Sequence, residues 1–203
     1  QLLAQRYEGQ LDEKADKFIG YAVDGAKRMQ GLISDLLAYS RVRTRGEELV
    51  PVDCAEVLAD VLQNLEHSIA ESGAEIVVGE LPRVCADRSQ LGQVFQNLIG
   101  NALKFRGEAP PRVEITARAA GERWELAISD NGIGIESGFH ERIFVIFQRL
   151  HGRGEYPGTG IGLSIVKSIV ERHGGRVHID SAEGKGTTVR FTLARGQPSG
   201  ERK

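Results

Sequence analysis

The chain has 203 residues, of which 40% are hydrophobic and 27% are charged, as is usual for a globular domain. Its formal net charge of -2 gives no basis for binding nucleic acid or an anionic membrane, and no run of about 18 apolar residues predicts membrane insertion. Two cysteines, Cys54 and Cys85, are too few for a disulfide framework or a zinc cluster and fit a cytoplasmic protein.

The amino-terminal part of the chain is predicted to be helical. Residues 1–8 are typical of the end of a helix, and a longer helix is expected from Asp12 to about Val42. Its apolar residues alternate at spacings of four and three, which indicates a coiled-coil seam or a helix bundle. We therefore expect a homodimer that packs through residues 1–43; the alternative is that the stripe packs on its own chain. The stripe comprises Leu11, Ala15, Phe18, Ala22, Gly25, Met29, Leu32, Leu36 and Tyr39.

After a charged linker that ends at Gly46, the pattern changes to short strands and helices. Asp53 and Asp87 are candidate amino-terminal caps for two of the helices. Together these elements predict an α+β fold, in which a helical hairpin fragment precedes a two-layer α/β sandwich with a mixed sheet. The expected strands cover residues 49–53, 74–79, 83–86, 112–119, 124–129, 176–180 and 187–193, and the expected helices cover 54–72, 88–105 and about 160–173.

The helix that ends near Phe105 carries a polar stripe beside its apolar face. Gln93, Asn97, Asn101 and Lys104 follow one another at spacings of four, four and three, so their side chains stack on successive turns. A carboxamide oxygen suits Mg²⁺, which keeps several waters and completes its shell with phosphate, and an ammonium serves as a point charge for phosphate. The alternative is an amphipathic helix whose polar edge faces water.

Glycine is abundant, and many of the 25 glycines lie between Gly132 and Gly186. The carboxylate of Asp130, at a strand end before two glycines, can accept the exocyclic amine of adenine, although a simple Asx turn is the alternative. Glycine amides in 158–163 precede a helix and suit phosphates, but this pattern is weak by itself. Residues 148–157 would form a mobile lid, with Arg149 as the fork for a terminal phosphate oxygen.

Taken in order, four segments resemble the N, G1, F and G2 boxes of sensor histidine kinases. They are Asn97…Asn101…Lys104, Asp130-Asn-Gly-Ile-Gly134, Phe144-Val-Ile-Phe147 and Gly158-Thr-Gly-Ile-Gly-Leu163. The resemblance covers about residues 47–194 as a catalytic ATP-binding domain with the Bergerat (GHKL) fold of gyrase-type ATPases. It implies a partial dimerisation and histidine-phosphotransfer hairpin over 1–46, a catalytic domain over 47–195 and a disordered tail over 196–203. The segments 36–41, 147–151 and 155–157 are similar to the kinase modules of phytochrome-type light sensors.

The resemblance also implies roles for individual residues, with ATP and Mg²⁺ as cofactors. Asn101 would coordinate Mg²⁺ with support from Asn97, Lys104 and Arg149 would contact phosphates, and Asp130 would hold the adenine amine. The pocket would be shaped by Gly132, Gly134, Ile135, Gly158, Thr159, Gly160, Ile161, Gly162 and Leu163, with Thr187 on the adenine side.

The acceptor histidine of the family lies in an H box upstream of Gln1, so the chain is expected to be a fragment. Its five histidines, His67, His140, His151, His173 and His178, are expected to be structural or solvated. Val145 also replaces a polar residue often found in the F box.

The leading hypothesis is a cytoplasmic histidine kinase module. It would transfer the γ-phosphoryl of ATP to a histidine, for onward transfer to a response-regulator receiver domain. One alternative is a non-catalytic pseudokinase scaffold, which the intact boxes disfavour. A second is a gyrase-like ATPase, which would need a basic glutamate where this chain has Asn97; an amide cannot act as that base.

Overall fold

The computed structural model describes residues 6–7, 12–44, 47–148, 150 and 159–196. It confirms the predicted α+β class. The helices are α2 (Glu13–Thr44), α3 (Cys54–Asn64), α4 (Glu66–Ser72), α5 (Arg88–Lys104) and α6 (Gly162–Arg172), with short 3-10 turns η1 (Ser137–Phe139) and η2 (Arg142–Phe144). The strands are β1 (Val50–Asp53), β2 (Glu75–Val78), β3 (Arg83–Ala86), β4 (Arg112–Ala120), β5 (Arg123–Asp130), β6 (Val177–Ser181) and β7 (Thr187–Ala194).

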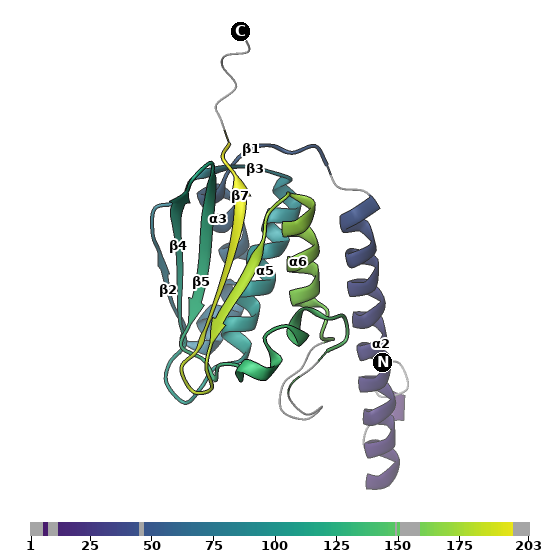
Figure 1. Ribbon diagram of the computed structural model, residues 1–203. Helices are drawn as coiled ribbons and strands as arrows, with labels where there is room; N and C mark the ends of the chain where they lie inside the picture. The colour runs from purple at the N-terminus through teal and green to yellow at the C-terminus, as the bar shows by residue number, and fades with distance from the viewer. Residues whose placement is uncertain (1–5, 8–11, 45–46, 149, 151–158, 197–203) are drawn as a thin grey trace.

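A five-stranded mixed sheet forms one layer of the sandwich, and α5 and α6 pack on one of its faces (Figure 1). The strand order is β2-β4-β5-β7-β6, in which only the β2–β4 pair is parallel. Alternate residues of β7 face the helices, as period-two geometry requires. Phe191 of β7, for example, meets Phe95 of α5 edge to face with ring centroids 6.4 Å apart. β1 and β3 form a separate antiparallel pair.

The outer face of the sheet carries mostly polar and charged side chains. Arg118 Nε donates to Glu125 Oε1 across 2.6 Å between β4 and β5, and Arg190 of β7 forms an ion pair with Asp180 of β6. Such exposed pairs contribute little to stability. They do keep this face solvated, which leaves the helical face to build the core.

Helix α5 begins where the sequence predicts. The Asp87 side chain accepts the backbone N–H of Gln90 at 3.1 Å, which satisfies one of the free N–H groups at the helix start. Leu91, Val94 and Phe95 are buried, so the apolar stripe faces the core and the polar stripe is left at its edge. This orientation positions the functional side chains described below.

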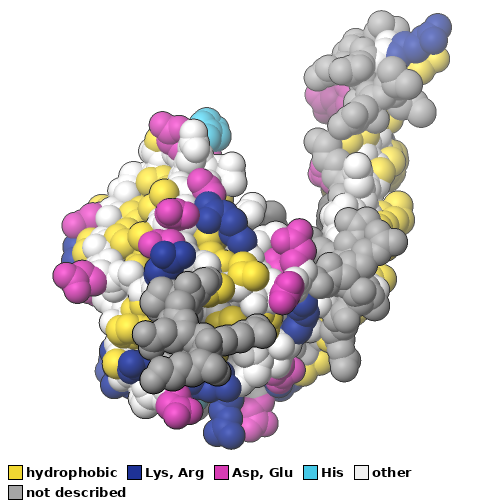
Figure 2. Space-filling view, turned by 90° about the horizontal axis from the view of Figure 1, so that it is seen from above, with side chains coloured by type: hydrophobic (Ala, Val, Ile, Leu, Met, Phe, Trp, Pro, Cys, Tyr) yellow, Lys and Arg dark blue, Asp and Glu magenta, His cyan; other side chains and the backbone are white. Residues whose placement is uncertain are grey.

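Helix α2 lies beside α6 and continues past the rest of the domain (Figure 1). The predicted apolar stripe divides between two environments. Leu32 and Tyr39 pack against the core of the same chain, and the neighbouring Val42 is buried. Other large apolar side chains of the helix are exposed, although Ile19 and Val23 are half-buried, and Figure 2 shows yellow side chains along the projecting helix. These exposed residues are Phe18, Tyr21, Met29, Ile33, Leu36 and Leu37.

Four details differ from the sequence predictions. The single helix expected over 54–72 is divided at Leu65, whose backbone (φ -97, ψ 3) leaves the helical region. Helix α2 extends to Thr44, into the predicted linker, and the two 3-10 turns were not predicted. Gly196, placed in a disordered tail by the sequence, donates its N–H to Arg83 O at 3.1 Å; the rest of that tail lies outside the described residues.

Across the part of the chain that the structure describes, no helix has the length and apolarity needed to cross a bilayer.

Candidate nucleotide-binding site

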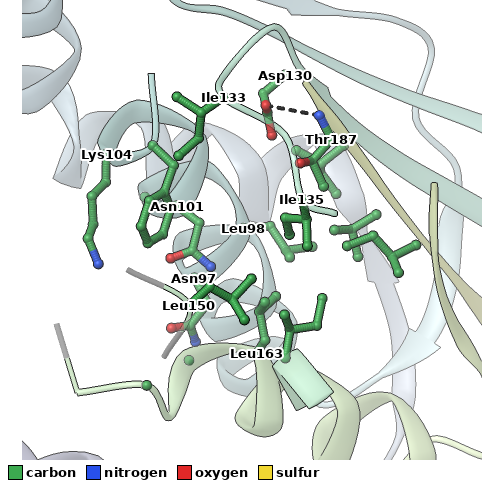
Figure 3. A pocket seen from close by; sticks show the side chains of 18 of the residues that line it. Asn97, Leu98, Asn101, Lys104, Asp130, Ile133, Ile135, Leu150, Leu163 and Thr187 are labelled. Carbon is green, nitrogen blue, oxygen red and sulfur yellow. Dashed lines mark hydrogen bonds between the residues drawn. The ribbon is translucent and has the colours of Figure 1, made fainter. Parts of the chain in front are cut away.

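A cavity of about 470 Å³ opens between α5, the amino terminus of α6 and the loop after β5. This volume is in the range of small-molecule sites. Polar and apolar side chains both line it, and Figure 3 shows Asn97, Asn101 and Lys104 across the pocket from Asp130 and Thr187.

The polar stripe of α5 forms one wall. Asn97, Asn101 and Lys104 project from successive turns toward the same side of the pocket (Figure 3). Asn97 Nδ2 donates to Gln93 O at 2.9 Å, which fixes the carboxamide and turns its oxygen toward Gly162. A Cβ added to Gly162 would lie 2.9 Å from Asn97 Oδ1, so glycine keeps this oxygen accessible. The wall therefore offers neutral oxygen ligands next to an ammonium group.

Asp130 stands at the opposite side of the pocket, at the end of β5. Its Oδ1 accepts two backbone N–H groups, from Gly132 at 2.9 Å and from Thr187 at 3.1 Å, and Figure 3 shows the second of these bonds. Burial raises the pKa of this carboxyl, while the two hydrogen bonds oppose that rise. Because Oδ1 is held by the backbone, Oδ2 remains to accept a donor from a ligand in the pocket.

The loop after β5 is held from three directions, so Asp130 is part of a rigid frame. Ile133 N donates to Phe105 O at 3.0 Å, at the end of α5. On the other side Ile133 O accepts Gly184 N at 2.7 Å, and Ile135 N donates to Ser181 Oγ at 2.8 Å. Side chains cannot replace two glycines here: a Cβ on Gly132 would collide with Phe105 O, and one on Gly134, which has φ +70, would collide with a backbone carbonyl.

The glycine loop before α6 closes the pocket near the asparagines. Gly160 and Gly162 line it, and Gly162 is the first residue of α6, so the positive end of the helix dipole points into the site. Phe147 N donates to Gly160 O at 3.1 Å and thereby joins the predicted F box to this loop. Phe147 is the one non-glycine residue with positive φ among the described residues, at φ 65.

The structure brings together most of the predicted site. Gly132 supports Asp130 from behind, and Ile161 is fully buried in the core rather than in the pocket wall. Arg149 and Gly158 lie outside the described residues. The predicted residues that line the pocket are Asn97, Asn101, Lys104, Asp130, Gly134, Ile135, Thr159, Gly160, Gly162, Leu163 and Thr187.

The apolar side of the pocket was not predicted. Ile128, Val189 and Ile179 form one row across β5, β7 and β6, because the register pairs Val189 with both of the others. Their strand alternation was visible in the sequence, but the pairing that joins them was not. Gln148 and Leu150 of the predicted lid also line the pocket, and the other lid residues, 149 and 151–157, lie outside the described residues. Pocket residues outside the prediction are Leu65, Gln96, Leu98, Gly100, Phe105, Ile133 and Ile143.

Comparison with known proteins identifies the class. Residues 86–197 match the family model described as "Histidine kinase-, DNA gyrase B-, and HSP90-like ATPase". The match covers more than half of the chain and includes the α5 stripe, Asp130 and the glycine loop. The chain belongs to this ATPase family.

Its relatives include phytochrome-like proteins and other sensor histidine kinases. The chain is 50% identical over 196 residues to the phytochrome-like protein Cph1 of Synechocystis sp., covering 97% of this chain and 26% of that protein. It is 48% identical over 203 residues to cyanobacterial phytochrome A of Nostoc sp., covering 100% of this chain and 26% of that protein. The chain thus spans about a quarter of the length of these relatives.

Solved structures support the same class. Full-length ShkA in complex with AMPPNP is similar with a TM-score of 0.73 and 28% identity, over 94% of this chain and 41% of that chain. The histidine kinase ThkA in complex with the response regulator TrrA is similar with a TM-score of 0.72 and 25% identity, over 98% of this chain and 57% of that chain. The predicted histidine kinase catalytic module is confirmed, and nothing in these comparisons favours the pseudokinase alternative.

Proposed function

We propose that this domain binds Mg·ATP in the pocket between α5 and α6 and donates the γ-phosphoryl group to a histidine that lies outside residues 1–203. The observation that carries the proposal is the convergence of the α5 amides, Asp130 and the glycine loop on one cavity. The adenine would lie at the Asp130 side, against the apolar row of the sheet. The phosphates would then extend toward Lys104 and the positive end of α6.

The oxygen ligands fit Mg²⁺ bound together with phosphate. Asn101 would supply a carboxamide oxygen to the ion. Asn97 would support the site, because the bond from Asn97 Nδ2 to Gln93 O holds the Asn97 carboxamide in place. When bound, the ion neutralises charge on the phosphates. The chain itself positions the nucleotide through Asp130 and supplies positive charge through Lys104.

The chemistry favours transfer over hydrolysis. In the proposed step, an imidazole nitrogen forms a bond to the γ-phosphorus while the bond from that phosphorus to the ADP oxygen breaks. Asn97 occupies the position of a water-activating base in gyrase-type relatives, and an amide cannot accept the proton from water. Positioning and charge neutralisation then carry the reaction.

A radiolabelled-ATP assay tests the transfer. The chain is mixed with a separate helical hairpin that carries a kinase acceptor histidine, and we expect acid-labile, base-stable phosphate on the hairpin and none on the chain. The Asn101→Ala variant should leave the hairpin unlabelled. Label on the chain itself, or none on the hairpin while ATP binds, would contradict the proposal.

We further propose that the chain dimerises through residues 1–43, and that the histidine phosphorylated by this domain passes its phosphoryl group to a receiver domain in the cytoplasm. The exposed apolar residues of α2 support dimerisation, because an apolar stripe of this length is otherwise left in water. Replacing Ile33 and Leu37 by glutamate should shift the chain to a monomer in sedimentation equilibrium. The matched Gln30→Glu variant, on the same helix, should remain a dimer, and a monomeric wild-type chain would refute this interface.

A further inference from the structure

The carboxyl end of α2 is capped by the catalytic domain. Helix α2 ends at Thr44, so the carbonyl of Val42 is one of the last four, which have no partner within the helix. Gln90 of α5 supplies the missing donor, with Nε2 donating to Val42 O at 3.3 Å. Both Val42 and Gln90 are buried, so this bond lies out of water.

The chain is held again directly after the linker. Glu47 N donates to Asp87 Oδ2 at 2.8 Å, and Glu47 O accepts Arg172 Nη2 at 2.7 Å. Arg172 also donates through Nη1 to Gln90 Oε1 at 2.8 Å. Arg172 and Gln90 therefore connect α6, α5, the end of α2 and the first residue after the linker. We call Asp87, Gln90 and Arg172, with the backbone groups of Val42 and Glu47, the linker clamp.

Two of the three clamp side chains are buried polar groups, and Arg172 is half-buried. Asp87 is 1% exposed and Gln90 is 6% exposed. Asp87 Oδ2 accepts Glu47 N, and Gln90 Nε2 donates to Val42 O, only while the linker lies in this position. A buried polar group that loses such a partner is costly. The clamp therefore favours one orientation of the catalytic domain relative to α2.

In that orientation the glycine loop lies against α2. A Cβ added to Gly31 would be 3.7 Å from Thr159 Cγ2, so the phosphate side of the pocket meets the side of α2 that also carries the buried Val42. At 100° per residue, the exposed side chains of Phe18, Met29, Ile33 and Leu36 lie about 140° to 200° from Gly31 round the helix axis. A second helix packed on that exposed face is separated from the phosphate side of the pocket by α2 itself.

We propose that Arg172 and Gln90 are positioning residues, which clamp the linker and hold the catalytic domain along α2 in a resting arrangement that opens before phosphoryl transfer. The opening before phosphoryl transfer rests on the proposed function, in which the acceptor histidine belongs to a helix packed on the exposed face of α2. The clamp does not rest on the proposed function, because its hydrogen bonds involve no nucleotide.

Distance measurements by electron spin resonance test the clamp without ATP. Spin labels are placed at Asp24→Cys on α2 and Glu183→Cys in the β6–β7 turn, both exposed, after Cys85→Ser; Cys54 is buried. Labelled chain is diluted into unlabelled chain so that only distances within one chain are recorded. We expect one narrow distribution for the wild-type chain. Arg172→Ala should add a broad second population, and Arg172→Lys, which keeps the charge without the two-pronged reach, should give an intermediate result.

The control is Arg176→Ala, which removes an exposed arginine four residues away and should leave the distribution narrow. Circular dichroism establishes that each variant is folded, and Gln90→Met provides a second break of the clamp if Arg172→Ala does not fold. A narrow, wild-type distribution in a folded clamp variant overturns the proposal.

The activity readout uses the whole kinase dimer with its acceptor histidine. Arg172→Ala should raise the rate constant of histidine phosphorylation several-fold and leave the KM for ATP unchanged, because the nucleotide pocket is intact. A lower rate with a broadened distribution would show that the clamped arrangement is the productive one and would overturn the resting assignment. Loss of ATP binding in the wild-type chain would refute the proposed function and leave the distance result standing.

Discussion

Asp130→Asn offers the sharpest test of how the pocket recognises adenine. The backbone N–H groups of Gly132 and Thr187 both point at Oδ1, at 2.9 and 3.1 Å. In the variant these two N–H groups require an acceptor, so the amide oxygen of the asparagine takes the position of Oδ1 and the NH₂ group takes the position of Oδ2. The NH₂ group is a donor and faces the exocyclic amine of adenine, which is also a donor, so the hydrogen bond is lost. A hydrogen bond to a charged group contributes about 2 kcal/mol, so we expect the Kd for ATP to rise about 30-fold.

The assay is calorimetric titration at pH 7.5 with ATP and with purine riboside triphosphate, which lacks the exocyclic amine. The wild-type chain should prefer ATP, and the variant should bind the two nucleotides with similar affinity. Asp180→Asn, on the outer face of the sheet, serves as the control and should retain the preference. Equal loss of affinity for both nucleotides in Asp130→Asn would mean general damage to the pocket and would refute the proposed contact.

Three further predictions concern the phosphate side and the buried histidine. Gly162→Ala places a methyl group against Asn97 Oδ1 and should weaken Mg·ATP binding about tenfold, or about 1.4 kcal/mol. The control is Gly92→Ala, whose added methyl group meets its neighbours at ordinary packing distances and should not change the calorimetric Kd. Lys104→Ala should weaken ATP binding by about 1 kcal/mol and leave adenosine binding unchanged, while the exposed Lys185→Ala changes neither; a loss with adenosine would contradict a phosphate role. Burial lowers the pKa of His173 below 6.5, and His173 Nε2 accepts the backbone N–H of Asp87 at 3.0 Å. As the pH falls, His173 therefore takes up a proton in the unfolded chain before it does so in the folded chain. The free energy of unfolding should fall as the pH drops below about 6.5 toward the pKa of His173 in the folded chain. His173→Gln should remove this pH dependence in urea titrations.

Local signals in the sequence were sufficient for much of the fold. Asp87 predicted the start of α5 because an N-cap acts within three residues, and the polar stripe followed from the helical period alone. Asp130 was found for a similar reason: a carboxylate directly after a strand and before glycines is a short-range pattern. His173, expected to be structural, is buried and bonded to Asp87 N and Ile169 O.

The features that the sequence did not predict depend on pairing between distant segments. The apolar row at Ile128, Val189 and Ile179 exists only once the strand register is set. Arg172 meets Glu47 across 125 positions of sequence, so no local pattern indicated the linker clamp. The break at Leu65 was missed because residues 54–72 carry no proline and no glycine.

The central claim is that Asn101 helps to hold a magnesium-bound adenine nucleotide in the pocket between α5 and α6. Calorimetric titration of the chain with ATP, with and without Mg²⁺, tests it most directly. We expect saturable binding that weakens on removal of the metal, and we expect Asn101→Ala to lose this metal dependence while it still binds adenosine. Absence of binding at millimolar Mg·ATP, or an unchanged metal dependence in Asn101→Ala, would contradict the account.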